Sequence, residues 1–166
     1  MDIYVINVDG TGLTRLTTDP AGDALPAWSA DGRRIAFSSG RAGQPDIYVM
    51  DADGRNVVRL TVNNAADQRP AWSPDGRIAF HSNRDGNFEI YVMNADGSHQ
   101  VRLTTNPAED GSPSWSPDGS RIVFHRRVLT HYQIHVMNAD GTDVRRLTEL
   151  SPIVANGYPS WGPAGR

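Results

Sequence analysis

The four tryptophans of this 166-residue chain recur at a nearly constant spacing. Trp28, Trp72, Trp115 and Trp161 are separated by 44, 43 and 46 residues, and similar text surrounds each of them. A fixed period in the forties is typical of proteins in which every repeat forms one small supersecondary unit. The spacing therefore restricts the fold before any single residue is considered.

Each repeat reads as four short strands joined by tight turns. In the second copy, Ser73-Pro74-Asp75-Gly76 favours a type I turn, because Pro presets φ and Gly suits the exit. Asn94-Ala95-Asp96-Gly97 contains Asp-Gly, a strong hairpin signal. We therefore expect one antiparallel four-stranded sheet per repeat. The strands predicted in this copy are residues 70–73, 77–81, 89–93 and 100–104.

The second and third strands of each repeat are apolar on both faces. Successive side chains of a strand point to opposite faces, yet Ile90-Tyr91-Val92-Met93 is apolar throughout. In the equivalent second strand, Ile35 and Phe37 share one face and the small Ala36 occupies the other. A sheet with one face in water would alternate apolar with polar residues. The pattern predicts an all-β β-propeller of four-stranded antiparallel blades that nest large face against small face, with the tryptophans packed between them.

The chain forms a single predicted domain, residues 1–166, with an incomplete unit at each end. Residues 1–25 hold the last two strands of a blade, and residues 159–166 hold the first strand of a further blade. Together they lack one strand, the counterpart of residues 77–81. The full repeats are residues 26–69, 70–112 and 113–158.

Composition removes several classes of function. Cysteine and lysine are absent, which excludes disulfides, thiol nucleophiles and catalytic lysines. The net charge is −3 without a basic run, so we expect no nucleic-acid partner. No apolar run reaches membrane-spanning length and the first residues form a repeat strand, so we expect neither membrane insertion nor a signal peptide in this chain. Gly-x-Ser-x-Gly is also absent, and we expect no enzyme activity.

The histidines and the Asp-Gly turns are weak candidates for a metal site. His131 and His135 have a helical spacing, but they fall in a predicted loop and strand, where that spacing has no meaning. His81 and His125 occupy equivalent positions, which favours a structural or rim role. The turns at 51–54, 94–97 and 138–141 resemble the opening of a calcium loop but lack its distal glutamate. We predict no cofactor, with calcium as the alternative.

One set of residues has better prospects as a binding site. The loop before each inner strand carries aspartate in three copies and asparagine in the fourth, and inner strands line the channel of a propeller. A ring of carboxylates at the channel mouth suits a cation or a basic peptide. The alternative is that each aspartate fixes its own loop. Neighbouring residues differ between copies, as expected of a binding face and equally of neutral drift. The predicted partner-binding residues are Asp23, Asp67, Arg69, Asp110, Asn156 and Tyr158.

The repeats resemble those of the TolB-like propeller family, which is similar to the WD-repeat family. The resemblance lies in Asp67–Gly76, the Ile-Ala-Phe strand, the hairpin Ile90–Gly97 and Arg102–Thr104 with their copies, and it covers almost the whole chain. It implies a propeller, and either a protein-interaction scaffold like periplasmic TolB or the propeller domain of a serine peptidase. The chain departs from the pattern at residues 162–165, Gly-Pro-Ala-Gly, and has fewer than four complete blades where TolB has six.

Ring closure sets the expected oligomeric state. An open arc would leave one blade face uncovered at each end, which forgoes about 12–24 kcal/mol if each face holds four large apolar side chains. Association costs about 4–15 kcal/mol. We expect a homodimer that closes an eight-bladed ring; a closed four-bladed monomer and a fragment of a larger ring are the alternatives.

The expected function is a non-catalytic scaffold that binds a protein or peptide at the channel mouth. The resemblance to TolB favours a periplasmic or extracellular location. The alternatives are the propeller domain of a larger hydrolase or peptidase, and a metal- or sugar-binding ring.

Overall fold

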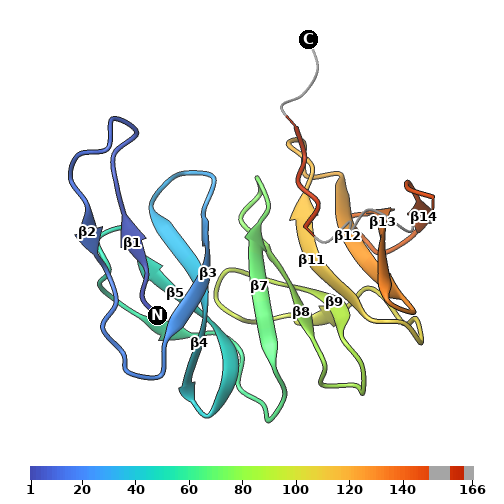
Figure 1. Ribbon diagram of the computed structural model, residues 1–166, viewed down its shortest axis with the longest axis horizontal. Coiled ribbons are helices and arrows are strands. Elements are labelled where there is room, and N and C mark those ends of the chain that lie inside the picture. The colour runs from blue at the N-terminus through green and yellow to red at the C-terminus, as the bar shows by residue number, and fades with distance from the viewer. Residues whose placement is uncertain (150–157, 163–166) are drawn as a thin grey trace.

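The computed structural model describes residues 1–149 and 158–162, and this part of the chain contains only β-strands and turns. Its strands form four antiparallel sheets that stand side by side in an arc (Figure 1). No helix that could cross a membrane is present among these residues. The all-β propeller architecture predicted from the sequence is confirmed.

Each sheet follows chain order, so neighbouring strands are joined by hairpins. The N-terminal sheet contains β1 (Tyr4–Val5) and β2 (Thr14–Arg15). The first full sheet contains β3 (Asp23–Trp28), β4 (Arg34–Ala42), β5 (Gln44–Asp51) and β6 (Val58–Arg59). The middle sheet contains β7 (Asp67–Trp72), β8 (Ile78–Ser82), β9 (Glu89–Met93) and β10 (Val101–Arg102). The last sheet contains β11 (Asp110–Trp115), β12 (Arg121–Val128), β13 (His131–Asn138) and β14 (Arg145–Arg146).

The inner strands begin three residues earlier than the sequence predicts. They start at Asp23, Asp67 and Asp110, so these aspartates belong to strands β3, β7 and β11 and not to the preceding loops. A register shift interrupts each inner strand two residues later; in β7 it lies between Gln68 and Ala71. This is the geometry of a β-bulge, which bends the strand and re-aims a side chain.

The bulge places ordinary residues in the left-handed region of backbone conformation. Leu25, Arg69 and Ser112 have φ angles of 57°, 56° and 51°. Residues other than glycine rarely adopt this conformation, and such positions cluster at functional sites. Each of the three full sheets repeats this strained position at the same end of its inner strand.

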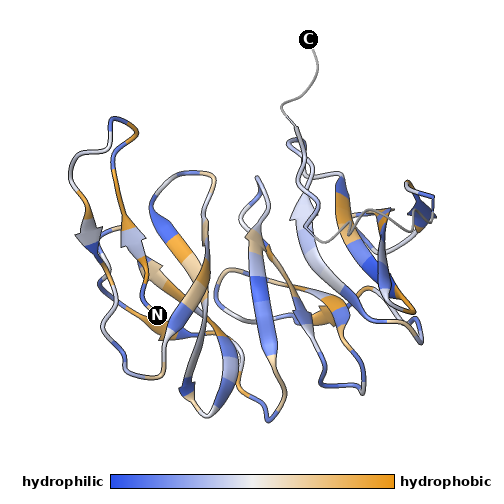
Figure 2. Cartoon of the chain, viewed as in Figure 1, coloured by the Kyte–Doolittle hydropathy of each residue, from blue (hydrophilic) through white to orange (hydrophobic). Residues whose placement is uncertain are grey.

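The core lies between the sheets, as the apolar faces of the second and third strands predict. Ala36 and Val49 from the first full sheet pack against Phe80, Tyr91 and Met93 from the middle sheet. Every residue of β8 and β9 is buried. In Figure 2 strand β9 of the middle sheet is coloured hydrophobic, whereas the inner strand β7 is largely hydrophilic. Small-against-large nesting of neighbouring sheets therefore holds the arc together.

The tryptophans differ in how far they are packed between neighbouring sheets. Trp115 is 6% exposed and its indole Nε1 donates a hydrogen bond to Ala71 O at 3.2 Å, across the junction with the middle sheet. Trp161 makes the equivalent bond to Ser114 O at 3.1 Å, so it takes the place of an inner-strand tryptophan although no strand is assigned around it. Trp28 is 48% exposed, contrary to the expected packing between sheets. The reason is that the N-terminal sheet has only β1 and β2 and offers no inner strand to receive it.

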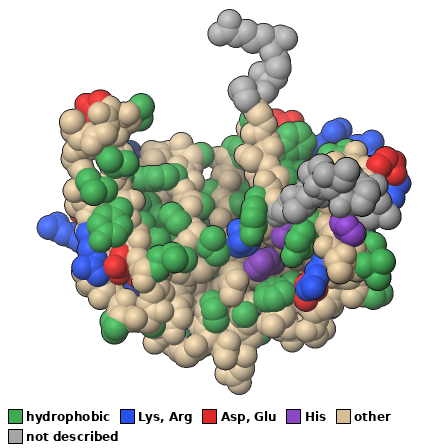
Figure 3. All heavy atoms as spheres, viewed as in Figure 1, with side chains coloured by type: hydrophobic (Ala, Val, Ile, Leu, Met, Phe, Trp, Pro, Cys, Tyr) green, Lys and Arg blue, Asp and Glu red, His purple; other side chains and the backbone are tan. Residues whose placement is uncertain are grey.

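The two ends of the arc do not meet within the described residues. Among the described strands, contacts between full sheets join the first to the middle and the middle to the last, and the N-terminal unit packs on the first full sheet through Ile3 and Leu16. Large apolar side chains are exposed at the N-terminal end, where Tyr4 is 52% and Ile6 53% exposed. Figure 3 shows hydrophobic side chains gathered over this end, on the left.

Candidate functional site

The three predicted aspartates are buried under the channel mouth. Asp23, Asp67 and Asp110 are 0% exposed. Each accepts from an arginine of its own sheet: Arg41 Nη2 donates to Asp23 at 2.9 Å and Arg84 Nη2 to Asp67 at 3.0 Å. The third pair is bidentate, and its arginine, Arg126, donates through Nε and Nη2 at 2.7 Å each. The carboxylates therefore secure the start of each inner strand and are not exposed to solvent.

The arginine of each pair is itself held by aromatic rings. The Arg84 guanidinium lies 5.4 Å from the Phe80 ring centre and 4.7 Å from that of Tyr91. In the first full sheet, burial raises the pKa of the Asp23 carboxyl, but hydrogen bonds from Ser39 and Arg41 outweigh it and hold the pKa below its usual range. Aspartate, arginine and aromatic ring thus form one repeated support beneath each bulge.

The three bulge residues and Tyr158, which has the equivalent position in the sequence of the fourth repeat, line a common groove. Leu25, Arg69, Ser112 and Tyr158 occupy equivalent positions in four successive repeats, each followed by proline. Together with those prolines they line a groove of about 240 Å³. We call this the channel-mouth groove. It places an aliphatic, a cationic, a hydroxyl and an aromatic side chain on one repeated backbone frame.

Arg69 and Tyr158 form a pair within this groove. The Arg69 guanidinium lies 4.3 Å from the centre of the Tyr158 ring, a cation–π contact between the middle sheet and the last described segment. The Arg69 backbone N–H donates to Ser38 Oγ at 3.1 Å, and this hydrogen bond links the middle sheet to the first full sheet. The Arg69 backbone is thus held by the neighbouring sheet, while its guanidinium contacts the Tyr158 ring.

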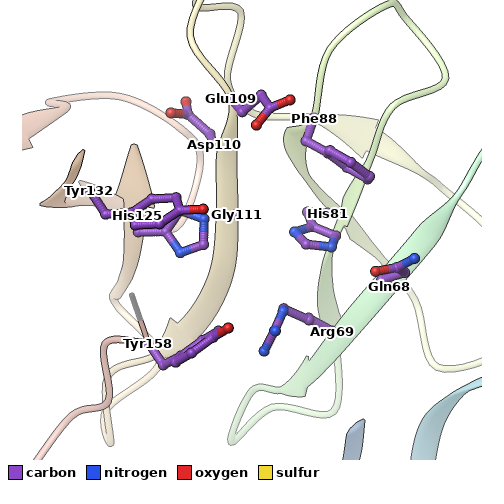
Figure 4. A pocket seen from close by; sticks show the side chains of 10 residues that line it. All are labelled: Gln68, Arg69, His81, Phe88, Glu109, Asp110, Gly111, His125, Tyr132 and Tyr158. Atoms are coloured by element: carbon purple, nitrogen blue, oxygen red, sulfur yellow. The ribbon is translucent and has the colours of Figure 1, made fainter. Parts of the chain in front are cut away.

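A second hollow lies beside the groove, between the middle and last sheets. This space of about 400 Å³ is lined by polar and aromatic side chains, and we call it the junction pocket. It shares Arg69 and Tyr158 with the channel-mouth groove. Figure 4 shows the two on one side of the pocket, with His81 and His125 facing each other across Gly111. The remaining lining residues are Gln68, Phe88, Glu109, Asp110 and Tyr132.

His81 is a second buried polar group of this pocket, beside Asp110. Its side chain is 7% exposed, and neither ring nitrogen has a hydrogen-bond partner among the described residues. Its ring lies 4.7 Å from that of Phe88. Burial, together with the neighbouring Arg69 and His125, lowers the pKa of His81 to about 3. The imidazole is therefore neutral at pH 7 and carries one donor and one acceptor.

The two acidic residues of the pocket already have cationic partners. Glu109 pairs with Arg127 at 3.0 Å, and Asp110 with Arg126 at 2.7 Å. The described residues give the Arg69 side chain no carboxylate partner. Arg69 is therefore the charged lining residue that has no oppositely charged side-chain partner among the described residues, and the sequence already singles it out.

The Asp-Gly turns behave as turns. Asp53, Asp96 and Asp140 each accept the backbone N–H two residues later, at distances of 2.9 to 3.0 Å. His131 and His135 lie on strand β13, so their helical spacing carries no meaning. The described part of the chain contains no group of three or more His, Cys, Asp or Glu that could hold a metal ion.

Of the six predicted site residues, the structure brings Arg69, Asp110 and Tyr158 together around the junction pocket. Asp23 and Asp67 support neighbouring bulges, and Asn156 lies outside the described residues. A role in partner binding stays a prediction for all six. Sequence reasoning missed His81 and Gly111 as pocket residues. The signal was their departure from the first copy, which has Ser38 and Ala24 at the equivalent positions.

Comparison with known proteins agrees with this geometry. Among solved structures, a protein assigned as TolB from Agrobacterium tumefaciens is 30% identical with a TM-score of 0.81, over 87% of this chain and 55% of that one. TolB from Acinetobacter baumannii shares the fold at 24% identity and a TM-score of 0.77, over 94% of this chain and 39% of that one. Dipeptidyl-peptidase 5 from Porphyromonas gingivalis is 42% identical over 42 residues, which are 25% of this chain and 6% of that protein.

The chain therefore spans 55% of the Agrobacterium chain, 39% of the Acinetobacter chain and only 6% of the peptidase. The family model described as TolB beta propeller domain matches residues 1–77 and 64–166, which together cover the whole sequence. With the repeated sheets, the bulged inner strands and the nested core, this match shows that the chain belongs to the TolB beta propeller domain family.

Proposed function

We propose that this chain is a non-catalytic scaffold that binds a protein or peptide over the channel-mouth groove. The observation that carries the proposal is the set of four residues at equivalent sequence positions, Leu25, Arg69, Ser112 and Tyr158. They differ in chemistry, yet they line one groove, and the first three occupy the same position of a repeated bulge. Three of them hold a strained backbone conformation, which supports a role beyond folding.

The groove suits an extended peptide better than a small rigid ligand. It is lined by four prolines together with the Arg69 cation and the Tyr158 ring. Arginine and tyrosine are enriched where protein interfaces gain most of their affinity. The buried aspartate–arginine pairs beneath it keep the frame rigid, which limits the entropy lost on binding.

Two further parts of the proposal concern assembly and location. A second copy of the chain closes the ring by covering the apolar end formed by β1 and β2, where Tyr4, Ile6 and Leu13 are exposed. The location that fits a TolB-like scaffold is the periplasm or the cell exterior.

The test is selection of peptides on the immobilised chain from a random phage-displayed library. We expect enriched sequences whose synthetic peptides bind at least tenfold more weakly to the double variant Arg69→Leu, Tyr158→Ala. The matched control is Arg55→Leu, which removes one positive charge from an exposed hairpin. A library that shows no enrichment over the bare surface would contradict the proposal, as would equal binding by the double variant.

A second candidate is the propeller domain of a larger peptidase. The local 42% identity to dipeptidyl-peptidase 5 favours it. Its test is the coding sequence that follows residue 166 in the source genome. An α/β segment with a Gly-x-Ser-x-Gly elbow would support this candidate, and any other continuation would speak against it.

A further inference from the structure

The two junctions of the middle sheet differ in one side chain that should be equivalent. At the junction with the first full sheet, Ser38 Oγ accepts the N–H of Arg69 at 3.1 Å. At the junction with the last sheet, His81 stands at the position of Ser38, and neither of its nitrogens has a hydrogen-bond partner among the described residues. Buried polar groups in native proteins are nearly always hydrogen-bonded. A buried imidazole that has no protein partner and faces a cavity therefore marks a position where a ligand or water can bind.

Gly111 makes the space in which this imidazole is held. A β-carbon at this position would lie 2.7 Å from His81 Nδ1 and 2.8 Å from His125 Nε2, closer than such contacts occur. The equivalent residues in the other two inner strands are Ala24 and Gln68, which both carry a β-carbon. The close approach of the two rings to the β11 backbone therefore requires glycine, and it leaves the junction pocket open.

Charge selects the kind of ligand. Glu109 and Asp110 are paired with Arg127 and Arg126, whereas the Arg69 guanidinium rests on the Tyr158 ring without a carboxylate among the described residues. Guanidinium binds carboxylates through two parallel hydrogen bonds, and a neutral imidazole donates one more. The aromatic rings of Phe88 and Tyr132 form the apolar part of the pocket wall. Ligand pockets commonly combine such apolar walls with a few polar groups that orient the ligand.

We propose that the junction pocket binds a carboxylate of a peptide, with Arg69 as its ion-pair partner and His81 as a hydrogen-bond donor. The inference rests on the proposed function, because the pocket and the channel-mouth groove share Arg69 and Tyr158. A peptide that lies over the mouth reaches the pocket with its C-terminus or with an acidic side chain.

The experiment uses the whole chain and three small probes. N-acetylphenylalanine presents a C-terminal carboxylate, its amide presents none, and N-acetylaspartate N-methylamide presents only a side-chain carboxylate. Binding is followed by calorimetry and by the imidazole NMR signals, with His81 assigned through His81→Ser. We expect at least one of the two carboxylates to bind tenfold or more tightly than the amide and to shift the His81 signals. The better of the two identifies the source of the carboxylate.

Variants then locate the site. Arg69→Leu introduces the residue found at the equivalent position 25, and we expect it to weaken the better carboxylate at least tenfold. His81→Ser introduces the equivalent of Ser38 and should weaken it severalfold, whereas Arg55→Leu should change it less than twofold. The acid–amide comparison needs no variant, so it decides the matter even where a variant folds poorly.

The inference is overturned if the amide binds as well as both acids, or if Arg69→Leu leaves carboxylate binding unchanged. Failure of the proposed function looks different. Peptides that bind the groove equally with free or amidated C-termini and without acidic residues would leave the scaffold function standing and remove the carboxylate pocket. Small carboxylates that bind when no peptide does would do the reverse.

Discussion

The N-terminal sheet and the middle sheet carry the same strand in two different settings. Tyr4 is 52% exposed, whereas Tyr91 at the equivalent position of β9 is 3% exposed. Ile6 is 53% exposed and its counterpart Met93 is 1% exposed. The side chains are equally apolar, so their burial depends on the neighbouring sheet and not on their own strand. In this fold one repeat supplies only half of each core layer, and its partner supplies the other half.

The largest effect that tests this comparison is the removal of matched tryptophans. Trp115→Ala should cost about 3–5 kcal/mol of unfolding free energy, because it opens a cavity at a buried junction and removes the bond to Ala71 O. Trp28→Ala should cost about 1 kcal/mol, since nearly half of this side chain already contacts water. Urea unfolding of both variants gives the two values. Equal costs would show that Trp28 is covered in solution, and the difference between the sheets would then vanish.

Acid should destabilise the middle sheet through the titration of His81. The N-terminal sheet lies within the first 22 residues, which contain no histidine. Because the folded-state pKa of His81 is lowered to about 3, the unfolded chain binds the proton more readily between pH 6.5 and 3. The stabilising effect is therefore complete above pH 6.5 and declines as the pH falls through this window. Since one pKa unit corresponds to about 1.4 kcal/mol, His81 accounts for about 2 kcal/mol between pH 6.5 and 4.5.

The measurement is urea unfolding of the original chain and of His81→Ser at pH 7 and pH 4.5. The variant should lose less stability on acidification. Burial also lowers the pKa of His135, but that group contributes equally to both proteins. The same loss in both would mean that water or a bound group already solvates His81.

The sequence predicts the architecture well because the same strand and turn motifs recur in successive repeats. The third strand of the middle sheet was expected at residues 89–93, and β9 occupies Glu89–Met93. The inner strands were expected to start at proline, with the preceding aspartates in loops. Each strand starts at the aspartate instead, and Leu25, Arg69 and Ser112 adopt the left-handed conformation within a bulge. Turn rules assign that conformation to glycine or asparagine; here the buried aspartate secures the strand before the bulge. Tertiary support of this kind is invisible in a local pattern.

The candidate site was predictable where copies differ at an obvious position, and not elsewhere. Arg69 and Tyr158 follow the repeated acidic position by two residues, so variation pointed to them. His81 recurs as His125, and repetition suggested a structural role. Only the packing shows that His81 lacks a hydrogen-bond partner among the described residues and that Gly111 makes room for it. For Trp28 the sequence predicts too much burial. Its repeat position indicates a core residue, but the sheet that would cover it is incomplete.

Ion pairs offer a smaller contrast between the same two regions. Asp67→Asn removes the carboxylate that faces Arg84 and Asn63 in a fully buried setting, and we expect a loss of about 2 kcal/mol. Asp2→Asn removes the partner of Arg15 at the N-terminal end, where both side chains are more exposed, and we expect a loss of about 0.5 kcal/mol. Thermal and urea unfolding compare the two. If Asp67→Asn kept full stability and lost peptide binding, Asp67 would act on the ligand directly and not through the inner strand.

The smallest effect on folding, and the sharpest test of assembly, comes from the exposed face of the N-terminal sheet. Ile6→Arg should change the unfolding free energy of the single chain by no more than about 0.5 kcal/mol, because this side chain is half exposed. If a second copy covers this face, the new charge would be buried there without a partner, and the dimer should dissociate. Light scattering behind size exclusion, over a range of concentrations, should then show twice the chain mass for the original protein and the chain mass for Ile6→Arg. Val62→Arg is the matched control, since Val62 is 74% exposed beyond β6, remote from β1 and β2 in the chain. A single-chain mass for the original protein at all concentrations would remove the dimer, and the exposed face would then await a partner of a different kind.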